Sequence, residues 1–351
     1  MFALIRGLTA RPARGNLGRR LEHREAPALY ELTEAVAARV KTRPVNDIYL
    51  TAGPVVAVTE QGSTWEKFND RGRRCLILGL SALKCLNHSE LAAILAHEYG
   101  HFSNRDTAGG SLAYQVNTSM QEMAVGLAGA GQLNPVWLFL RVYHRIYLRI
   151  TLGASRLQEL LADRYAALAY GGASLSNGLT NIIRESVVFQ VQANHEIGQA
   201  LQEKRAPHNL WQLPPLAVDD LNKLEDAVKH ILNRPTNAYD THPSPAQRIA
   251  AVDQIAEPND IDADTAPAED LVPELTVLQK ELTADISQKV LAHSRWGRPL
   301  ALTGVRTGGL PVLQRALLRC CPVAVPQSVR GCSDAQGGSR DRNPEPVQRA
   351  G

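Results

Sequence analysis

The sequence predicts a mainly α protein of the α+β class, in which a small β-sheet accompanies a larger set of helices. Long segments with apolar residues at every third or fourth position predict the helices. Short segments near the N-terminus, rich in β-branched and aliphatic residues, predict the strands. The chain has 351 residues, 44% of them apolar, so it is long enough and apolar enough to bury a core.

The first elements are one helix and the strands. Residues 24–42 carry apolar side chains at helical spacing and predict an amphipathic helix. Residues 47–59 and 73–78 are the strand segments, and Gly-Pro and a polar loop interrupt them. A helix then opens at Asn87 or Ser89, because both residue types cap helix N-termini well.

The rest of the chain is predicted to be helical. A long helix is expected from about Pro135 to Tyr170, with Gly153 as a potential break and Gly171-Gly172 as its end. Four more helices follow, at 175–203, 218–232, 245–255 and 271–293.

These elements divide the chain into five parts. Residues 1–14 form an N-terminal segment, and residues 15–255 form the main domain. Residues 256–270 are acidic and contain proline, which is typical of a linker. Residues 271–303 form a C-terminal helical segment. Residues 304–351 lack periodicity and are rich in Gly, Arg, Pro and Ser, so we expect a disordered tail.

The charge and the cysteines exclude some classes of function. The chain has 38 basic and 35 acidic residues, so its net charge of +3 does not indicate nucleic acid as a partner. The N-terminal apolar stretch is too short for a signal peptide. The five cysteines are odd in number and none lies in a C-x-x-C pair. We therefore expect a protein of the cytoplasm, or of the cytoplasmic face of a membrane.

Residues 123–150 are the strongest candidate for contact with a membrane. The part from 123 to 140 is uncharged and just reaches the roughly 18 residues that a spanning helix needs, but several glycines and a proline weaken it. After it, Arg141, Arg145 and Arg149 recur at every fourth position among apolar residues. Two interpretations stay open: a core helix with solvated arginines, or peripheral contact with an anionic membrane surface.

The most informative motif is HEYGH at residues 97–101. Histidines four residues apart lie on one face of a helix, so the imidazoles of His97 and His101 converge there, with Glu98 beside them. Two nitrogen donors and a neighbouring carboxylate suit a catalytic zinc ion. A five-residue pattern of this kind also occurs by chance, so it needs support from other residues.

That support comes from the long helix after residue 135. Glu159 is the leading candidate for a third ligand, because two histidines and a glutamate are an established zinc set. Asp163 lies on the same helical face, where it can accept a hydrogen bond from a ligating histidine. The alternative is that both acids are surface residues that pair with Arg156 or Arg164.

Three segments together resemble peptidase family M48, which includes the CAAX prenyl proteases and the HtpX-type membrane proteases. They are ELAAILAHEYGHFSNRD at 90–106, SRLQELLAD at 155–163 and THPSPAQRI at 241–249. The resemblance covers roughly residues 15–253. It implies a zincin-like metallopeptidase domain of the gluzincin type, with the sheet beside the HExxH helix. It also implies that residues 73–80 form an edge strand that binds extended substrate.

The resemblance implies one zinc ion per chain, held by His97, His101 and Glu159. Glu98 would be the general base for a zinc-activated water that hydrolyses a peptide bond in a protein or peptide. The implied function is therefore that of a zinc metalloendopeptidase.

Three further residues complete the predicted site. Asp163 would orient a ligating histidine from behind. His242 would donate to the oxyanion of the transition state, and Arg248 is the second choice for that role or for contact with substrate.

The chain also departs from the family pattern. The usual Asn-Ala segment before the metal-binding helix is not recognisable, since residues 58–61 read VTEQ near that place, and the hydrophobic helices of multi-span members are missing. Two alternatives therefore stand beside the peptidase: a catalytically degenerate zinc-binding adaptor in membrane-protein quality control, and a truncated nonfunctional family member. Neither the substrate nor the oligomeric state follows from the sequence.

Overall fold

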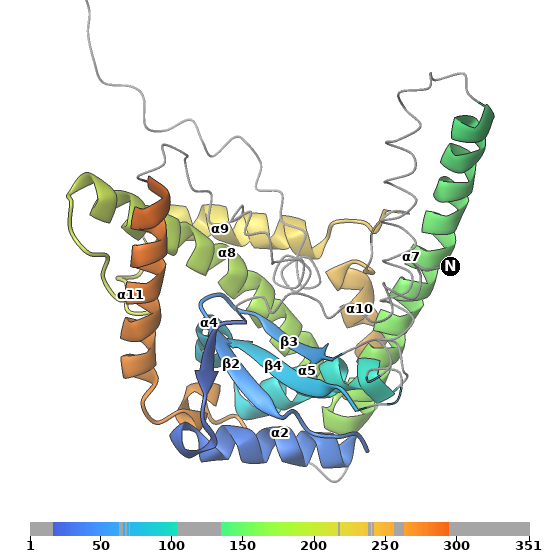
Figure 1. Cartoon of the computed structure of the whole chain (residues 1–351), viewed down its shortest axis with the longest axis horizontal. Coiled ribbons are helices and arrows are strands. Elements are labelled where there is room, and N and C mark those ends of the chain that lie inside the picture. Colours follow the sequence, from blue (N-terminus) through green and yellow to red (C-terminus); the bar gives the residue numbers. More distant parts are fainter. Residues whose placement is uncertain are drawn as a thin grey trace, which may run out of the picture.

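A computed structural model shows a mainly helical protein with one small sheet (Figure 1). The structure describes residues 17–62, 66, 69, 71–103, 135–216, 218–237, 240, 242–255 and 263–294. The predicted N-terminal segment, the predicted tail and residues 123–134 of the membrane candidate lie outside the described residues. The mainly α fold class is confirmed, whereas the five domain boundaries stay predictions.

The sheet has four strands in the order β1-β2-β4-β3, where β2 and β4 are parallel and the other pairs are antiparallel. The strands are β1 (Arg19–Leu21), β2 (Asp47–Thr51), β3 (Val56–Gln61) and β4 (Arg73–Gly79). The prediction that residues 73–80 form an edge strand is wrong, because β4 lies between β2 and β3. Its apolar run is buried on both faces, as is typical of an interior strand. The edge is β3.

Short elements flank the sheet. Helix η1 (His23–Glu25) leads into α2 (Pro27–Arg39), where one continuous helix was predicted from residue 24. Helix α4 (Leu80–Cys85) follows β4 directly. Neither α4 nor β1 was predicted, because elements of six and three residues give too little periodicity to detect.

Helix α5 (His88–Ser103) carries the HEYGH motif through the core, where it contacts β3, α2, α7 and α8. Asn87 caps it: Asn87 Oδ1 accepts from the Glu90 amide at 2.8 Å, and the Asn87 amide donates to Glu90 Oε2 at 3.1 Å. Tyr99 points away from the histidines and is fully buried. Its hydroxyl accepts from the Val45 amide and donates to the Thr33 carbonyl, which fixes the rotation of α5.

Helix α7 (Pro135–Tyr170) runs without a break through Gly153, and its N-terminal half extends away from the body of the molecule (Figure 1). It ends where the sequence predicted, because Gly171 takes a φ of 93°, which favours glycine. The remaining helices are α8 (Gly172–Gln202), α9 (Val218–Leu232), α10 (Pro245–Val252), η2 (Ala268–Leu271) and α11 (Leu275–Ser294).

The described end of the predicted linker packs on the start of α5. The Ser89 amide donates to the Asp264 carbonyl at 3.1 Å, and the Asp264 amide donates to Ser89 Oγ at 2.7 Å. Ala268 is fully buried beside them. Among the described residues, no helix combines the length and apolar content that crossing a bilayer requires.

Candidate metal centre

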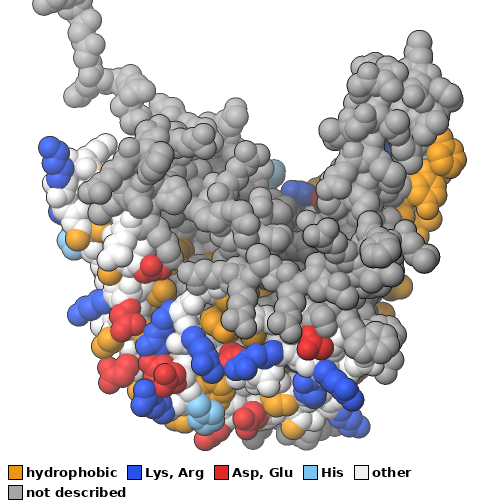
Figure 2. Space-filling view, in the orientation of Figure 1, with side chains coloured by type: hydrophobic (Ala, Val, Ile, Leu, Met, Phe, Trp, Pro, Cys, Tyr) orange, Lys and Arg blue, Asp and Glu red, His pale blue; other side chains and the backbone are white. Residues whose placement is uncertain are grey.

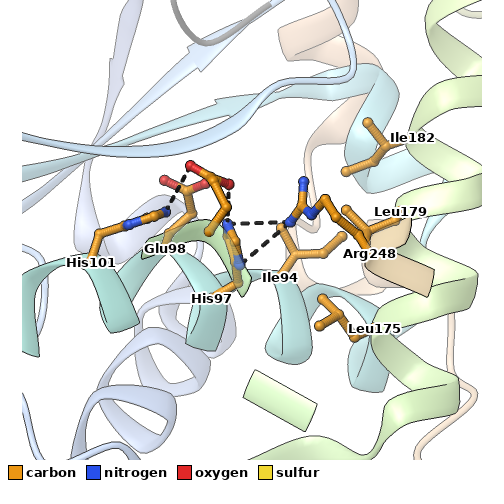
Figure 3. A pocket seen from close by; sticks show the side chains of 9 residues that line it. Ile94, His97, Glu98, His101, Leu175, Leu179, Ile182 and Arg248 are labelled. Atoms are coloured by element: carbon orange, nitrogen blue, oxygen red, sulfur yellow. Dashed lines mark hydrogen bonds and ion pairs between the residues drawn. The ribbon is translucent and has the colours of Figure 1, made fainter. Parts of the chain in front are cut away.

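Helix α5 presents His97 and His101 on one face, one turn apart. Their ring centroids are 4.9 Å apart and their planes are nearly perpendicular, at 87°. Figure 3 shows both rings on the same side of α5, with Glu98 beside them. His97 is buried, and only 12% of the His101 side chain is exposed. The helical spacing of the motif therefore produces the converging pair that the sequence predicts.

Glu159 reaches this pair from α7. Its Oε2 lies 3.5 Å from His97 Nε2, and its Oε1 lies 3.5 Å from His101 Nε2. One donor atom from each residue falls within 4.8 Å of the others. Tetrahedral zinc with ligands at about 2.0–2.1 Å places its donors roughly 3.4 Å apart, so the spacing of these atoms fits one zinc ion.

Close packing of α5 on α7 brings Glu159 into reach. Gly100 faces Ala162, and a Cβ atom at position 100 would lie 3.3 Å from the Ala162 Cα and 3.4 Å from its Cβ. Only glycine at this position lets the two helices approach so closely without a shift. The small fourth residue of HEYGH, Gly100, thus permits the short distance between the two helices.

The charge environment favours an ionised Glu159. Burial alone would raise the pKa of this carboxyl group. His242 and the two histidines of α5 outweigh burial and hold the pKa well below its usual value. An anionic carboxylate is the form that binds a metal ion.

Asp163 orients His97. Its Oδ1 lies 2.8 Å from His97 Nδ1, so that the Nδ1–H can donate and Nε2 faces Glu159. Asp163 is fully buried, and Arg248 neutralises it with two hydrogen bonds, from Nε at 2.8 Å and from Nη2 at 2.6 Å. Burial would raise the pKa of Asp163, but Arg248 and His97 hold it well below its usual range.

Arg248 thus has a structural partner that the sequence did not predict. Its Nη2 lies 3.5 Å from Nδ1 and 3.4 Å from Nε2 of His97, nearly equidistant, so the guanidinium lies over the face of the ring. The Ser244 capping box begins α10 four residues earlier and sets the direction of this helix. The predicted contact with the oxyanion or substrate stays a prediction.

His242 is brought to Glu159: its Nδ1 lies 3.1 Å from Glu159 Oε1. The loop that carries it is held by Arg156, whose Nη1 donates to the Asp240 carbonyl at 2.8 Å. The structure therefore places His242 at the centre, and its role toward the oxyanion stays a prediction.

Glu98 lies between the metal-binding face and the sheet edge. The Val58 amide of β3 donates to Glu98 Oε2 at 3.2 Å, and Glu98 is buried. In the antiparallel pairing of β3 with β4, this amide points away from the sheet. Residues 58–61 stand near the place of the family's Asn-Ala segment, and that position is the sequence signal for the contact between Val58 and Glu98.

An apolar wall borders the centre on the side of α8. A pocket is lined by Ile94 of α5 and by Leu175, Leu179 and Ile182 of α8, together with His97, His101, Glu159, Glu98 and Arg248 (Figure 3). The arrangement joins three residues that could hold a metal ion, a second carboxylate and an apolar wall in one place.

Comparison with known proteins gives one family. The model of peptidase family M48 matches residues 71–256. A "Protease HtpX homolog" of Picrophilus torridus is 26% identical over 183 residues, which cover 50% of this chain and 57% of that protein. Another, of a Sulfurihydrogenibium species, is 26% identical over 254 residues, which cover 68% of this chain and 77% of that protein.

A solved structure is also similar. The crystal structure of S. mikatae Ste24p matches with a TM-score of 0.39 and 17% identity, over 72% of this chain and 56% of that chain. The matched regions thus cover less than two thirds of the Ste24p chain and of the Picrophilus protein.

Proposed function

The chain belongs to peptidase family M48, and from this membership we propose that it is a zinc-dependent metalloendopeptidase that hydrolyses peptide bonds in proteins or peptides. The observation that carries the proposal is the cluster of His97, His101 and Glu159 with Glu98 beside it. Two nitrogen donors and one carboxylate oxygen leave a position for substrate or water, which is typical of catalytic rather than structural zinc sites.

Zinc, when bound, supplies a Lewis acid that polarises a carbonyl oxygen and lowers the pKa of water towards about 7. Glu98 accepts the proton of the attacking water and passes it to the leaving amine. Asp163 and Arg248 keep Nε2 of His97 directed at the centre. His242 is the proposed donor to the developing oxyanion, because it lies next to Glu159 at the edge of the site.

The outer edge of β3 supports an extended substrate. The Val58 amide points away from the sheet and towards Glu98, so a polypeptide can add to β3 as a further strand and pass the catalytic groups. Binding through the backbone does not select a sequence. The apolar wall of α8 favours an aliphatic side chain next to the bond that is cut.

The proposal is tested with Glu98→Gln. Purified wild-type protein should contain about one zinc ion per chain by mass spectrometry of metals, and should cleave an unfolded protein such as casein. Glu98→Gln should keep the zinc and lose at least about 10²-fold in cleavage rate, because only the proton acceptor is removed. The surface variant Glu225→Gln should keep both properties.

Retention of cleavage by Glu98→Gln would contradict the proposal. Zinc-loaded wild-type protein without cleavage of any tested protein would favour the adaptor, for which partner binding should not depend on Glu98.

The predicted location, in the cytoplasm or on the cytoplasmic face of a membrane, stays a prediction.

A further inference from the structure

The first half of α7 exposes large apolar side chains on one side. Phe139, Val142, Tyr143, Ile146 and Ile150 are each between 49% and 67% exposed. They form the apolar surface at the outer side of α7 in Figure 2. The interpretation of this segment as a buried core helix is therefore wrong for these residues.

These side chains form one stripe. At 100° per residue, all five fall within an arc of roughly 100° around the helix axis. Leu157 is also exposed and continues the stripe, so it extends from Phe139 over roughly 27 Å at 1.5 Å per residue. Single exposed apolar residues are common on soluble proteins, but a continuous stripe of this length indicates a surface that contacts a partner.

The charges beside the stripe indicate the partner. From Pro135 to Gln158 the helix contains no acidic residue, and its charged side chains other than His144 are arginines. Arg145 and Arg149 are exposed and lie on one flank of the stripe. Long basic side chains beside an apolar face can reach lipid phosphates while the face inserts among the acyl chains.

The aromatic residues fit the same partner. Phe139 and Tyr143 are stacked, with ring centroids 6.0 Å apart, at the outer end of the stripe. Aromatic rings concentrate at the boundary between headgroups and acyl chains. A protein partner with a complementary groove would need acidic residues opposite the arginines, whereas anionic lipid provides negative charge along the whole helix.

We propose that the side of α7 formed by Phe139, Val142, Tyr143, Ile146 and Ile150 lies in the plane of an anionic lipid leaflet, with Arg145 and Arg149 on the phosphates. The helix lies on the bilayer and does not cross it. Glu159 follows Ile150 by nine residues on the same helix, roughly 14 Å along the axis, so the candidate metal centre is held close to the membrane surface. This contact does not depend on catalysis.

The test uses the full chain and sedimentation with lipid vesicles. Wild-type protein should bind vesicles of phosphatidylcholine with 30% phosphatidylserine, and bind pure phosphatidylcholine at least tenfold more weakly. The double variant Ile146→Gln/Ile150→Gln should lose at least tenfold in binding to the anionic vesicles, because it removes apolar surface that inserts. Arg145→Gln/Arg149→Gln should bind both kinds of vesicle about equally weakly.

A matched control is available on other helices. Leu221 and Val277 are also exposed apolar residues, so Leu221→Gln/Val277→Gln should bind like wild type. Circular dichroism and zinc content check that each variant is folded. Absence of wild-type binding to anionic vesicles would overturn the proposal, and so would equal binding by all variants. Dimerisation in ultracentrifugation that Ile146→Gln/Ile150→Gln abolishes, without vesicle binding, would overturn it in favour of an interface between copies.

Discussion

At the scale of single residues, Asp163 decides which nitrogen of His97 is available to a metal. Its carboxylate contacts Nδ1 at 2.8 Å, and Arg248 holds the carboxylate with two hydrogen bonds. A buried carboxylate without this arginine would be costly to keep ionised. Burial favours the neutral form of His97, but the charge and hydrogen bond of Asp163, together with Glu159, raise its pKa to about 9. The three residues from α5, α7 and α10 act as one unit.

Asp163→Asn should lower zinc affinity about 10–100-fold, because removal of such an outer partner leaves the histidine less basic and less well oriented. Competition with a chromophoric chelator measures the affinity. The exposed variant Asp220→Asn is the control and should bind zinc like wild type. An unchanged affinity in Asp163→Asn would show that His97 keeps its orientation without the carboxylate.

The sequence predicted the residues of the centre better than their contacts. His97, Glu98 and His101 followed from helical spacing alone, because their geometry is local. Glu159 was the leading candidate for a third ligand from its residue type and position, but only the family resemblance favoured it over a surface role, since it lies on another helix. The bond between Arg248 and Asp163 spans 85 residues, and the contact of Val58 with Glu98 spans 40, so no local pattern could reveal either.

At the scale of elements, the distance between α5 and α7 controls the third ligand. Gly100→Val should push the helices apart, because even a Cβ atom at position 100 is in tight contact with Ala162. We expect reduced zinc content and a loss of about 1–3 kcal/mol in the free energy of unfolding, measured with urea.

The control is the same substitution at Gly198 in α8, where a Cβ atom meets nothing within 4 Å. Gly198→Val should keep the zinc and should not destabilise the protein, since valine is a better helix former than glycine. Equal losses of zinc and stability in the two variants would mean that the contact of Gly100 with Ala162 does not control the centre.

The end of α8 is tied to the following loop by Glu196. Arg205 donates to Glu196 Oε1 at 2.6 Å, and the His208 amide donates to the same oxygen at 2.7 Å. The hydrogen bond from Arg205, helped by that amide, lowers the pKa of Glu196 to about 2 despite the opposing effect of burial. A lowered pKa stabilises the fold above the unfolded-state value of about 4.5.

Glu196→Gln should therefore lower the free energy of unfolding at pH 7 by about 1–2 kcal/mol. The difference from wild type should shrink as the pH falls from 4.5 towards 2, because the wild-type carboxylate then becomes protonated. Urea unfolding at several pH values measures this. Glu203→Gln, at an exposed partner of Arg205, should cost less than about 0.5 kcal/mol. A difference independent of pH would exclude the charge of Glu196 as its cause.

Most helices were predictable because their ends carry local signals, such as the cap at Asn87 and the left-handed Gly171. The order of the strands in the sheet could not be predicted from local signals. It depends on which distant segments pair, and β4 was assigned to the edge when it lies inside the sheet. The continuous apolar run of β4 was the sequence signal for an interior strand.

At the scale of the whole molecule, a metal ion would join α5 and α7, which are far apart in the sequence. Zinc at about 100 times its dissociation constant should stabilise the folded protein by about 2.7 kcal/mol. For a domain of this size, the melting temperature should rise by roughly 5–10 °C. Scanning calorimetry with and without a chelator measures the change.

Glu98→Gln should show the same rise in melting temperature, because Glu98 is not a ligand, and His101→Ala should show little. A full rise in His101→Ala would mean that the ion binds elsewhere.

The fold class was predictable from the periodicity of the chain, whereas the outward direction of the apolar stripe on α7 was not. Periodicity shows that a helix has an apolar face, but only the packing shows whether that face is covered.

The hydrogen bond between the Val58 amide and Glu98 has a consequence for the order of events. One N–H group makes one strong hydrogen bond, so it cannot serve Glu98 and the carbonyl of an added strand together. A polypeptide that pairs with β3 at this position therefore displaces the carboxylate. Binding of an extended chain would therefore free Glu98, the proposed proton acceptor, in the same step. A ligand too short to reach Val58 would leave Glu98 bonded to the Val58 amide.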